Sequence, residues 1–342
     1  MKIFYNGKCI KAMSCGQSME PSSKGMLIAK YKFDCSKADL FPEFNEGFEY
    51  IFVDEQIDER DVMSVNRETV TVMTYDAEPD EYGILTTEYE VETPALINAG
   101  DIVTRSIYSN ELPTKMTFGY NQDSSYSNAT IASSLLSVMS MNCSKLVDGY
   151  RMFKDCSNLT SINYDWNQCR LQHHIGMFQN CKSLIDVNFE GLVAGSSINM
   201  ASMFAGCHSL TEINTNGWDT SKVKNMSNAF AYCKSIISLD ISNFATSNVT
   251  TIAGMFNNCS KLKELTIANF DLNKTTGLSN LFTNCNVLDY IDCTNVDSYS
   301  VGIISGLLLH RTNQTAGTIV CKTALGTDTL NALSNRNWNI VA

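Results

Sequence analysis

The chain has no run of apolar residues long enough to cross a membrane as a helix. The longest run, from Val301 to Leu309, is interrupted by Gly302 and Ser305, whereas a spanning helix needs about 20 apolar residues. The opening stretch MKIFYNGKCIKAMSCGQ also lacks the apolar core of a signal peptide. We therefore expect neither membrane insertion nor a cleaved secretory signal.

Histidine is scarce, and the common catalytic and cofactor-binding motifs are missing. The 342 residues include four histidines but no H-E-x-x-H, G-x-S-x-G, P-loop, dinucleotide-binding glycine motif or C-x-x-C pair. His173 and His174 could join His208 at a metal, and Cys169 could act as a nucleophile beside them, but no carboxylate pattern supports either site. We predict a protein that is not an enzyme, with no catalytic residue, metal or cofactor.

Proline and excess negative charge are confined to the first third of the chain. All five prolines lie at or before Pro113, and residues 1–117 hold 21 acidic and 11 basic side chains, whereas residues 118–342 hold 15 and 14. Segments 24–33, 48–53, 68–75, 83–92 and 101–108 are rich in β-branched and aromatic residues, which favours strands. We predict a mostly-β, acidic anchoring or docking domain at residues 1–117, and no nucleic-acid partner because no basic face is visible.

Six of the thirteen cysteines recur at a nearly constant interval. Cys156, Cys181, Cys207, Cys233, Cys259 and Cys285 are 25, 26, 26, 26 and 26 residues apart. Each follows a phenylalanine by three residues: Phe153, Phe178, Phe204, Phe230, Phe256 and Phe282. A fixed period in this range indicates a solenoid, which we place at residues 118–296, with these twelve residues in its core.

Each repeat contains two apolar periodicities. In Met226–Cys233 the apolar residues have helical spacing, and in Leu239–Ile241 the spacing changes to two, as in a strand. We therefore predict an α/β leucine-rich-repeat solenoid, with short parallel strands and short helices. We interpret the cysteines as a stacked column of buried thiols acting as small apolar fillers; a metal chain or a disulfide ladder is the alternative.

The residues between the buried strand positions should form a polar sheet face. Solenoids commonly bind partners on such a face, although it could equally be a merely solvated surface. The candidate binding residues are Asn163, Asp186, Asn188, Glu212, Asn214, Asp240, Glu264, Thr266, Tyr290 and Asp292.

The repeat stops after Val296, and the remaining residues should close the solenoid. An open end would expose an apolar cross-section, so terminal caps are expected. We predict a capping segment at residues 297–342, with a strand at Thr318–Cys321, a helix from about Asp328, and Trp338 covering the end.

The phrases LDISNFATSNVTTIAGMFNNCSKL and INTNGWDTSKVKNMSNAFAYC resemble the BspA-type leucine-rich repeat, L-x-x-L-D-L-S-N-F-D-T-S-x-V-x-x-M-x-x-M-F-x-x-C. The similarity covers about residues 140–296. The repeat ending at Cys181 is one residue short and has His174 where Met200 and Met226 stand in later repeats.

The resemblance implies a non-enzymatic surface module, since such repeats occur in bacterial adhesins, protist surface proteins and phage-encoded structural proteins. We expect a structural or binding protein of a phage particle, located in a tail, fibre or capsid appendage of the virion and used for host attachment. The N-terminal domain would contact other virion or surface proteins, and the solenoid a host receptor, protein or glycan. A homo-oligomer is expected. The alternatives are a bacterial cell-surface adhesin and an intracellular interaction scaffold.

Overall fold

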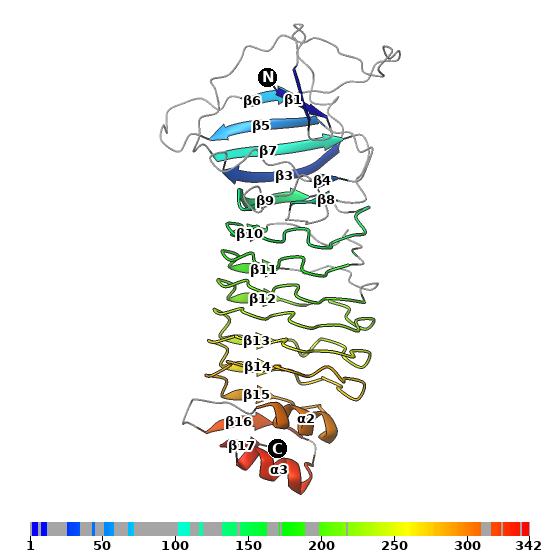
Figure 1. Ribbon diagram of the computed structural model, residues 1–342, viewed down its shortest axis with the longest axis vertical. Helices are drawn as coiled ribbons and strands as arrows, with labels where there is room; N and C mark the ends of the chain where they lie inside the picture. Colours follow the sequence, from blue (N-terminus) through cyan, green and yellow to red (C-terminus); the bar gives the residue numbers. More distant parts are fainter. Residues whose placement is uncertain are drawn as a thin grey trace.

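The computed structural model describes seventeen stretches of the chain. They are residues 2–5, 8–11, 26–34, 43–44, 51–57, 68–71, 102–109, 116–118, 132–141, 144–162, 171, 173–188, 198–216, 218–308, 316–322, 324–335 and 337–341. In these stretches the molecule is an elongated column of stacked strands and coils, with the N-terminal strands at one end and the C-terminal helices at the other (Figure 1).

A six-stranded sheet joins the N-terminal region to the first coil of the solenoid. Its order is β10-β9-β3-β7-β5-β6, with antiparallel pairing from β9 to β6 and parallel pairing between β9 and β10. The strands are β3 (Met26–Asp34), β5 (Ile51–Ile57), β6 (Glu68–Thr71), β7 (Ile102–Ser109), β9 (Leu135–Met141) and β10 (Ser161–Ile162).

Two small antiparallel pairs lie outside this sheet, β1 (Lys2–Tyr5) with β2 (Lys8–Lys11) and β4 (Glu43–Phe44) with β8 (Met116–Thr117). Four of the five segments predicted as N-terminal strands contain strands β3, β5, β6 and β7, while segment 83–92 lies outside the described residues. Strand β9 belongs to the segment assigned to the solenoid, yet it pairs with β3. The sheet therefore runs across the boundary that we predicted at residue 117.

The solenoid strands are short and parallel. They are β11 (Asp186–Asn188), β12 (Glu212–Asn214), β13 (Ser238–Asp240), β14 (Glu264–Thr266) and β15 (Tyr290–Asp292). Equivalent residues of successive coils face each other, so that Leu239 lies opposite Leu265, which lies opposite Ile291. The prediction of a six-repeat solenoid with short parallel strands is confirmed, and the solenoid is a parallel β-solenoid.

The C-terminal segment adds two more strands to the same sheet. Helix α2 (Ser298–Leu307) begins at Asp297, whose side chain accepts hydrogen bonds from the N–H groups of Tyr299 and Ser300. Strand β16 (Gly317–Val320) pairs with β15, and after helix α3 (Thr327–Ser334), strand β17 (Trp338–Val341) pairs with β16. The strand and the helix expected here are present, and Trp338 is buried within the last added strand.

The prediction of a short helix in each repeat is wrong. Residues 226–233 form consecutive turns, and among the described residues of the repeats no coil contains an α-helix. The cause is a left-handed backbone at the positions five and one before each cysteine, for example Asn228 (φ 55°) and Tyr232 (φ 62°). An L-residue in this region interrupts a right-handed helix, although the apolar spacing remains that of a helical face.

These turns build a second ladder of hydrogen bonds between coils. The N–H groups of Asn228, Phe230 and Tyr232 donate to the next coil, at Ala253 (2.8 Å), Met255 (2.9 Å) and Asn257 (2.7 Å). The intervening N–H groups close turns within their own coil, as from Ala231 to the Asn228 carbonyl (3.0 Å). Turns therefore join successive coils on one side, and strands join them on the other side between β11 and β12 and from β13 to β15.

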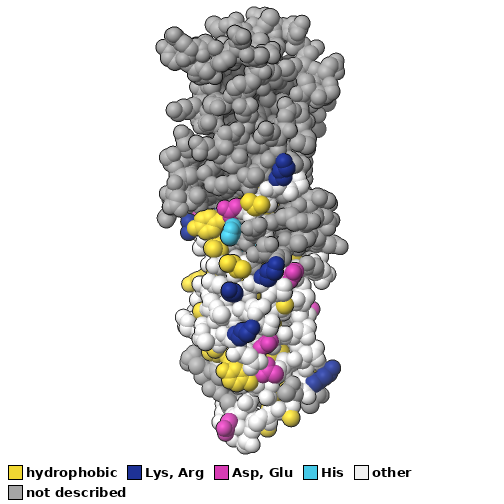
Figure 2. Space-filling model, turned by 90° about the vertical axis from the view of Figure 1, so that its right-hand side faces the viewer, with side chains coloured by type: hydrophobic (Ala, Val, Ile, Leu, Met, Phe, Trp, Pro, Cys, Tyr) yellow, Lys and Arg dark blue, Asp and Glu magenta, His cyan; other side chains and the backbone are white. Residues whose placement is uncertain are grey.

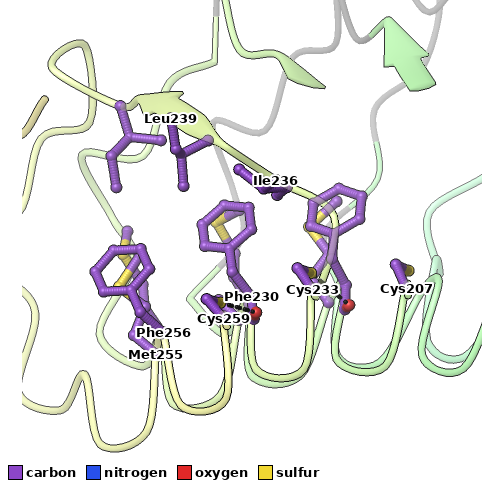
Figure 3. Close-up of a cluster of buried hydrophobic side chains, with 14 of the residues drawn as sticks. Cys207, Phe230, Cys233, Ile236, Leu239, Met255, Phe256 and Cys259 are labelled. Atoms are coloured by element: carbon purple, nitrogen blue, oxygen red, sulfur yellow. Dashed lines mark hydrogen bonds between the residues drawn. The ribbon is translucent and has the colours of Figure 1, made fainter. Parts of the chain in front are cut away.

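The phenylalanines form a continuous stack inside the column. Neighbouring ring centroids are 5.2 to 6.1 Å apart, and the ring planes are within 10° of parallel. Figure 3 shows Phe230 and Phe256 as two members of the row, beneath Leu239 and Ile236. The stack comprises Phe118, Phe153, Phe178, Phe204, Phe230, Phe256 and Phe282, all of them buried.

The column cysteines are buried beside the rings, and they are more than apolar fillers. Each thiol donates to the carbonyl of the phenylalanine in the preceding coil, as from Cys233 to Phe204 (3.3 Å) and from Cys259 to Phe230 (3.1 Å) (Figure 3). Equivalent bonds, 2.9 to 3.8 Å long, are made by Cys156, Cys181, Cys207 and Cys285. The six column cysteines, together with Cys293 and Cys321, are free, and burial raises the pKa of the Cys285 thiol to about 12.

We predict that Phe230→Ala destabilises the protein by about 3–5 kcal/mol, because it removes a buried ring and leaves a cavity between two neighbouring rings. Urea denaturation followed by circular dichroism measures the change. The exposed Lys234→Ala, four residues away, serves as the control and should change stability by less than about 0.5 kcal/mol. An unfolding midpoint for Phe230→Ala equal to that of the parent would contradict the stacked interior.

Candidate functional site

Because the interior of the column is filled, any binding site among the described residues must lie on its outer surface. Two surface columns carry the candidate binding side chains. One is the polar sheet face on strands β11 to β15, and the other is the edge of the solenoid beside the column cysteines.

The strand register brings the predicted polar residues together. Asp186 lies opposite Glu212, Asp240 opposite Thr266, and Glu264 opposite Tyr290. Asp186, Glu212, Asp240 and Glu264 are exposed, whereas Asn214, Thr266, Tyr290 and Asp292 are half-buried. Asn188 belongs to strand β11, and Asn163 lies outside the described residues.

Several members of this face take part in local turns. The side chains of Asn214, Asp240 and Asp292 each accept a hydrogen bond from the backbone N–H two residues further on (3.0, 2.9 and 2.8 Å). These contacts fix the chain as it leaves each strand, which is the usual role of such side chains in turns. The sequence pattern did not separate this role from binding, because both place a short polar side chain at the end of a strand.

The sheet face is electrostatically negative. Burial and the carboxylates of Asp292 and Glu264 raise the pKa of the Tyr290 phenol. Glu264 is its direct neighbour in the sheet, and Thr266 separates Asp240 from Asp292. Such a face would favour a cationic or neutral polar partner and repel an anionic one.

A second surface column carries positive charge from lysine side chains. We call it the cationic strip; it is formed by three basic residues and one aromatic residue, Lys182, His208, Lys234 and Tyr232. The three basic residues each follow a column cysteine by one position in successive coils. The coils are in contact there, because the Ser209 N–H donates to the Lys182 carbonyl (3.1 Å). Partial burial and then the charges of Lys234 and Lys182 lower the pKa of His208. Figure 2 shows Lys and Arg side chains at several heights on one face of the column, interspersed with Asp and Glu side chains.

Sequence reasoning missed the cationic strip, although the repeat alignment contains its signal. Lys182, His208 and Lys234 occupy one alignment column, but we assigned candidate binding roles only to the strand positions and considered His208 only as a metal ligand.

His174 is a buried polar side chain in the core of an otherwise apolar coil. It is 1% exposed, and neither ring nitrogen has a hydrogen-bond partner among the described residues. Burial and the adjacent His173 lower the pKa of His174 from 6.5 to about 4. His173 is exposed, so the two histidines do not converge on a shared ligand in the way that the metal alternative would need.

In the part of the chain that the structure describes, no three His, Cys, Asp or Glu side chains are grouped closely enough to hold a metal ion. No helix among the same residues is long and apolar enough to cross a membrane.

We predict that acidification destabilises the fold through His174, because the unfolded chain takes up a proton near pH 6.5 and the folded chain only near pH 4. The free energy of unfolding should therefore fall by about 2 kcal/mol between pH 7 and pH 5 through this residue. His174→Met introduces the residue found at the equivalent positions 200 and 226. This variant should lose about 2 kcal/mol less free energy of unfolding than the parent between pH 7 and pH 5. Urea denaturation at the two pH values measures it.

The exposed His173→Met is the matched control and should keep the acid sensitivity of the parent. An unchanged pH dependence in His174→Met would show that this imidazole is not buried in its neutral form.

Comparison with known proteins supports the repeat assignment. A family model described as Mycoplasma protein of unknown function, DUF285, matches residues 123–212 and 198–309. No curated protein matches the chain significantly, and no solved structure does. The two matches together span residues 123–309, which is more than half of the 342 residues. They coincide with the β-solenoid and helix α2, and the chain therefore belongs to the DUF285 family of repeat proteins.

Proposed function

We propose that this chain is a non-enzymatic binding protein that presents its solenoid to a partner on another surface. The observation that supports this most is the continuity of the column. Strand β9 joins the antiparallel N-terminal strands to the first coil, a ladder of turn hydrogen bonds joins each coil to the next, and strand pairing adds a second ladder between β11 and β12 and from β13 to β17. A stiff rod with side chains repeated along its length is better suited to presenting a binding surface than to forming an active site.

The state of the nucleophilic groups agrees with this proposal. The column thiols are buried and their pKa values are raised by burial, so they are poor nucleophiles in the folded state. Some of the exposed charged residues form surface columns of one sign, acidic on the sheet face and basic on the cationic strip. Such columns can steer and orient a partner.

The proposed location is a phage particle, where the acidic N-terminal region would contact neighbouring virion proteins and the solenoid would point outward to a host receptor. This location rests on the resemblance to repeats of phage structural proteins. In this arrangement the chain acts in host attachment, and a homo-oligomer would present several solenoids at once and strengthen weak contacts by avidity.

A bacterial cell surface is the second candidate location. The description of the matching family as a Mycoplasma protein supports a bacterial source, and the surface location rests on the resemblance to the repeats of bacterial adhesins. The partners would then be other surface proteins and a receptor on the colonised surface, with the same division of roles between the two ends of the column.

Immunogold electron microscopy with an antibody against the solenoid distinguishes these locations. Gold on purified phage particles is the expected result for the first proposal, and gold on intact, unpermeabilised cells is expected for the second. Labelling only inside permeabilised cells would contradict both and leave an intracellular scaffold. An antibody raised against an unrelated cytoplasmic protein controls for cell breakage.

A further inference from the structure

We infer that the cationic strip binds an acidic polysaccharide, with Tyr232 packing against a sugar ring while Lys182, His208 and Lys234 contact its carboxylate or sulfate groups. This inference rests on the proposed function and assigns its ligand-binding surface to the edge of the solenoid, away from the acidic sheet face.

Tyr232 occupies a backbone conformation that its side chain disfavours. Its φ is 62°, and a bulky residue in this left-handed region is strained. The five equivalent residues are of types that adopt this conformation readily: Asp155, Asn180, Gly206, Asn258 and Asn284. Tyr232 also gains little from burial, because 44% of it is exposed. An exposed aromatic ring held in a strained position is explained if the ring contacts a ligand.

On the side of the preceding coil, the space over the position equivalent to Tyr232 is filled by the amide of Asn180. Gly206 is the equivalent residue there and has no side chain, and a Cβ at this position would lie 2.5 Å from the Oδ1 atom of Asn180. The Asn180 amide is oriented by its bond to Asp155 (2.7 Å). The ring is thus followed along the column by a glycine and then by an oriented amide oxygen, which can accept a hydrogen bond from a sugar hydroxyl.

The basic side chains beside this row give it a positive charge. Lys182 and Lys234 are exposed, and His208 between them is half-buried. Both charges that act on His208 are the lysine ammonium groups. Because coils repeat at about the spacing of neighbouring strands, roughly 4.8 Å, the ammonium groups of Lys182 and Lys234, which are two coils apart, lie at an interval comparable to the length of a disaccharide, with the neutral His208 imidazole between them. A linear polymer with a regular negative charge matches this arrangement.

A peptide partner fits this surface less well. The N–H groups of Asn180, Gly206, Tyr232 and Asn258 all donate to the following coil (2.7 to 2.8 Å). The strip therefore has no unpaired strand edge at these residues to which an extended peptide could add. Recognition has to use side chains, and an aromatic ring, an amide and ammonium groups are together suited to an acidic sugar.

Binding of the full chain to immobilised polysaccharides tests this assignment. The probes are heparin, which carries sulfate and carboxylate groups, hyaluronan, which carries carboxylates alone, and neutral dextran. We expect binding to at least one acidic polymer and none to dextran, and the two acidic probes identify which group is recognised. Tyr232→Asn should weaken binding at least about tenfold, while it raises the thermal midpoint by about 2–4 °C because it relieves the strained backbone.

A charge-matched pair of variants separates specific binding from simple attraction. Lys182→Gln with Lys234→Gln should abolish binding. Lys222→Gln with Lys274→Gln removes the same charge from exposed positions eleven residues before two column cysteines, and it should leave binding within about twofold of the parent.

Three kinds of outcome would overturn the inference, the last of them being the absence of polysaccharide binding. The first is equal loss in both double variants, or equal binding of poly-glutamate and duplex DNA without dependence on Tyr232, either of which would indicate unspecific charge attraction. The second is a lowered thermal midpoint in Tyr232→Asn with unchanged polysaccharide binding, which would assign the ring a structural role. Surface labelling in the immunogold experiment together with no polysaccharide binding would remove this inference and leave the proposed function intact.

Discussion

The hydrogen bonds that pass from each coil to the next on the turn side are the constraint on which the rest of the structure depends. They require a left-handed backbone five and one residues before every column cysteine, as at Asn228 and Tyr232. This geometry turns the phenylalanine between them into the interior at the same height in every coil. The phenylalanine carbonyl then accepts a hydrogen bond from a thiol of the next coil, as the Phe204 carbonyl does from Cys233. The aromatic stack, the thiol column and the surface columns all follow from that register.

The sequence predicted the interior and the strands well, because both depend on which residues repeat. The cysteine interval placed Phe230 and Cys233 in the core, and alternation placed Leu239 inward on a strand. The sequence pattern did not predict the turns, because apolar spacings of three and four occur equally in a helix and in this series of turns. The information that distinguishes the turns from a helix lies in the residue types and not in their spacing. Asn, Asp and Gly dominate the two left-handed positions, and these types favour turns and disfavour the interior of a helix.

Surface function was harder to predict than the core, because one residue type can serve two purposes. Asp240 and Asp292 belong to the polar sheet face and also fix the turns that follow their strands. Conversely, Tyr232 occupies a position where the turn alone would favour asparagine or glycine. We assign a ligand to this surface because Tyr232 departs from the residue types that the turn favours, and the polarity of the surface column is the weaker indication. Membership of the DUF285 family establishes the repeat architecture and leaves the ligand to this physical argument.

The most direct test of the backbone ladder is the difference in stability between Asn284→Gly and Asn284→Ala. Both variants remove the same exposed amide side chain, so their difference reports the backbone at a position where φ is 61°. A left-handed backbone makes the glycine variant the more stable by about 1 kcal/mol. A helical turn would make the alanine variant the more stable by a similar amount. Urea denaturation that shows alanine to be the better residue would contradict the stacked-turn architecture.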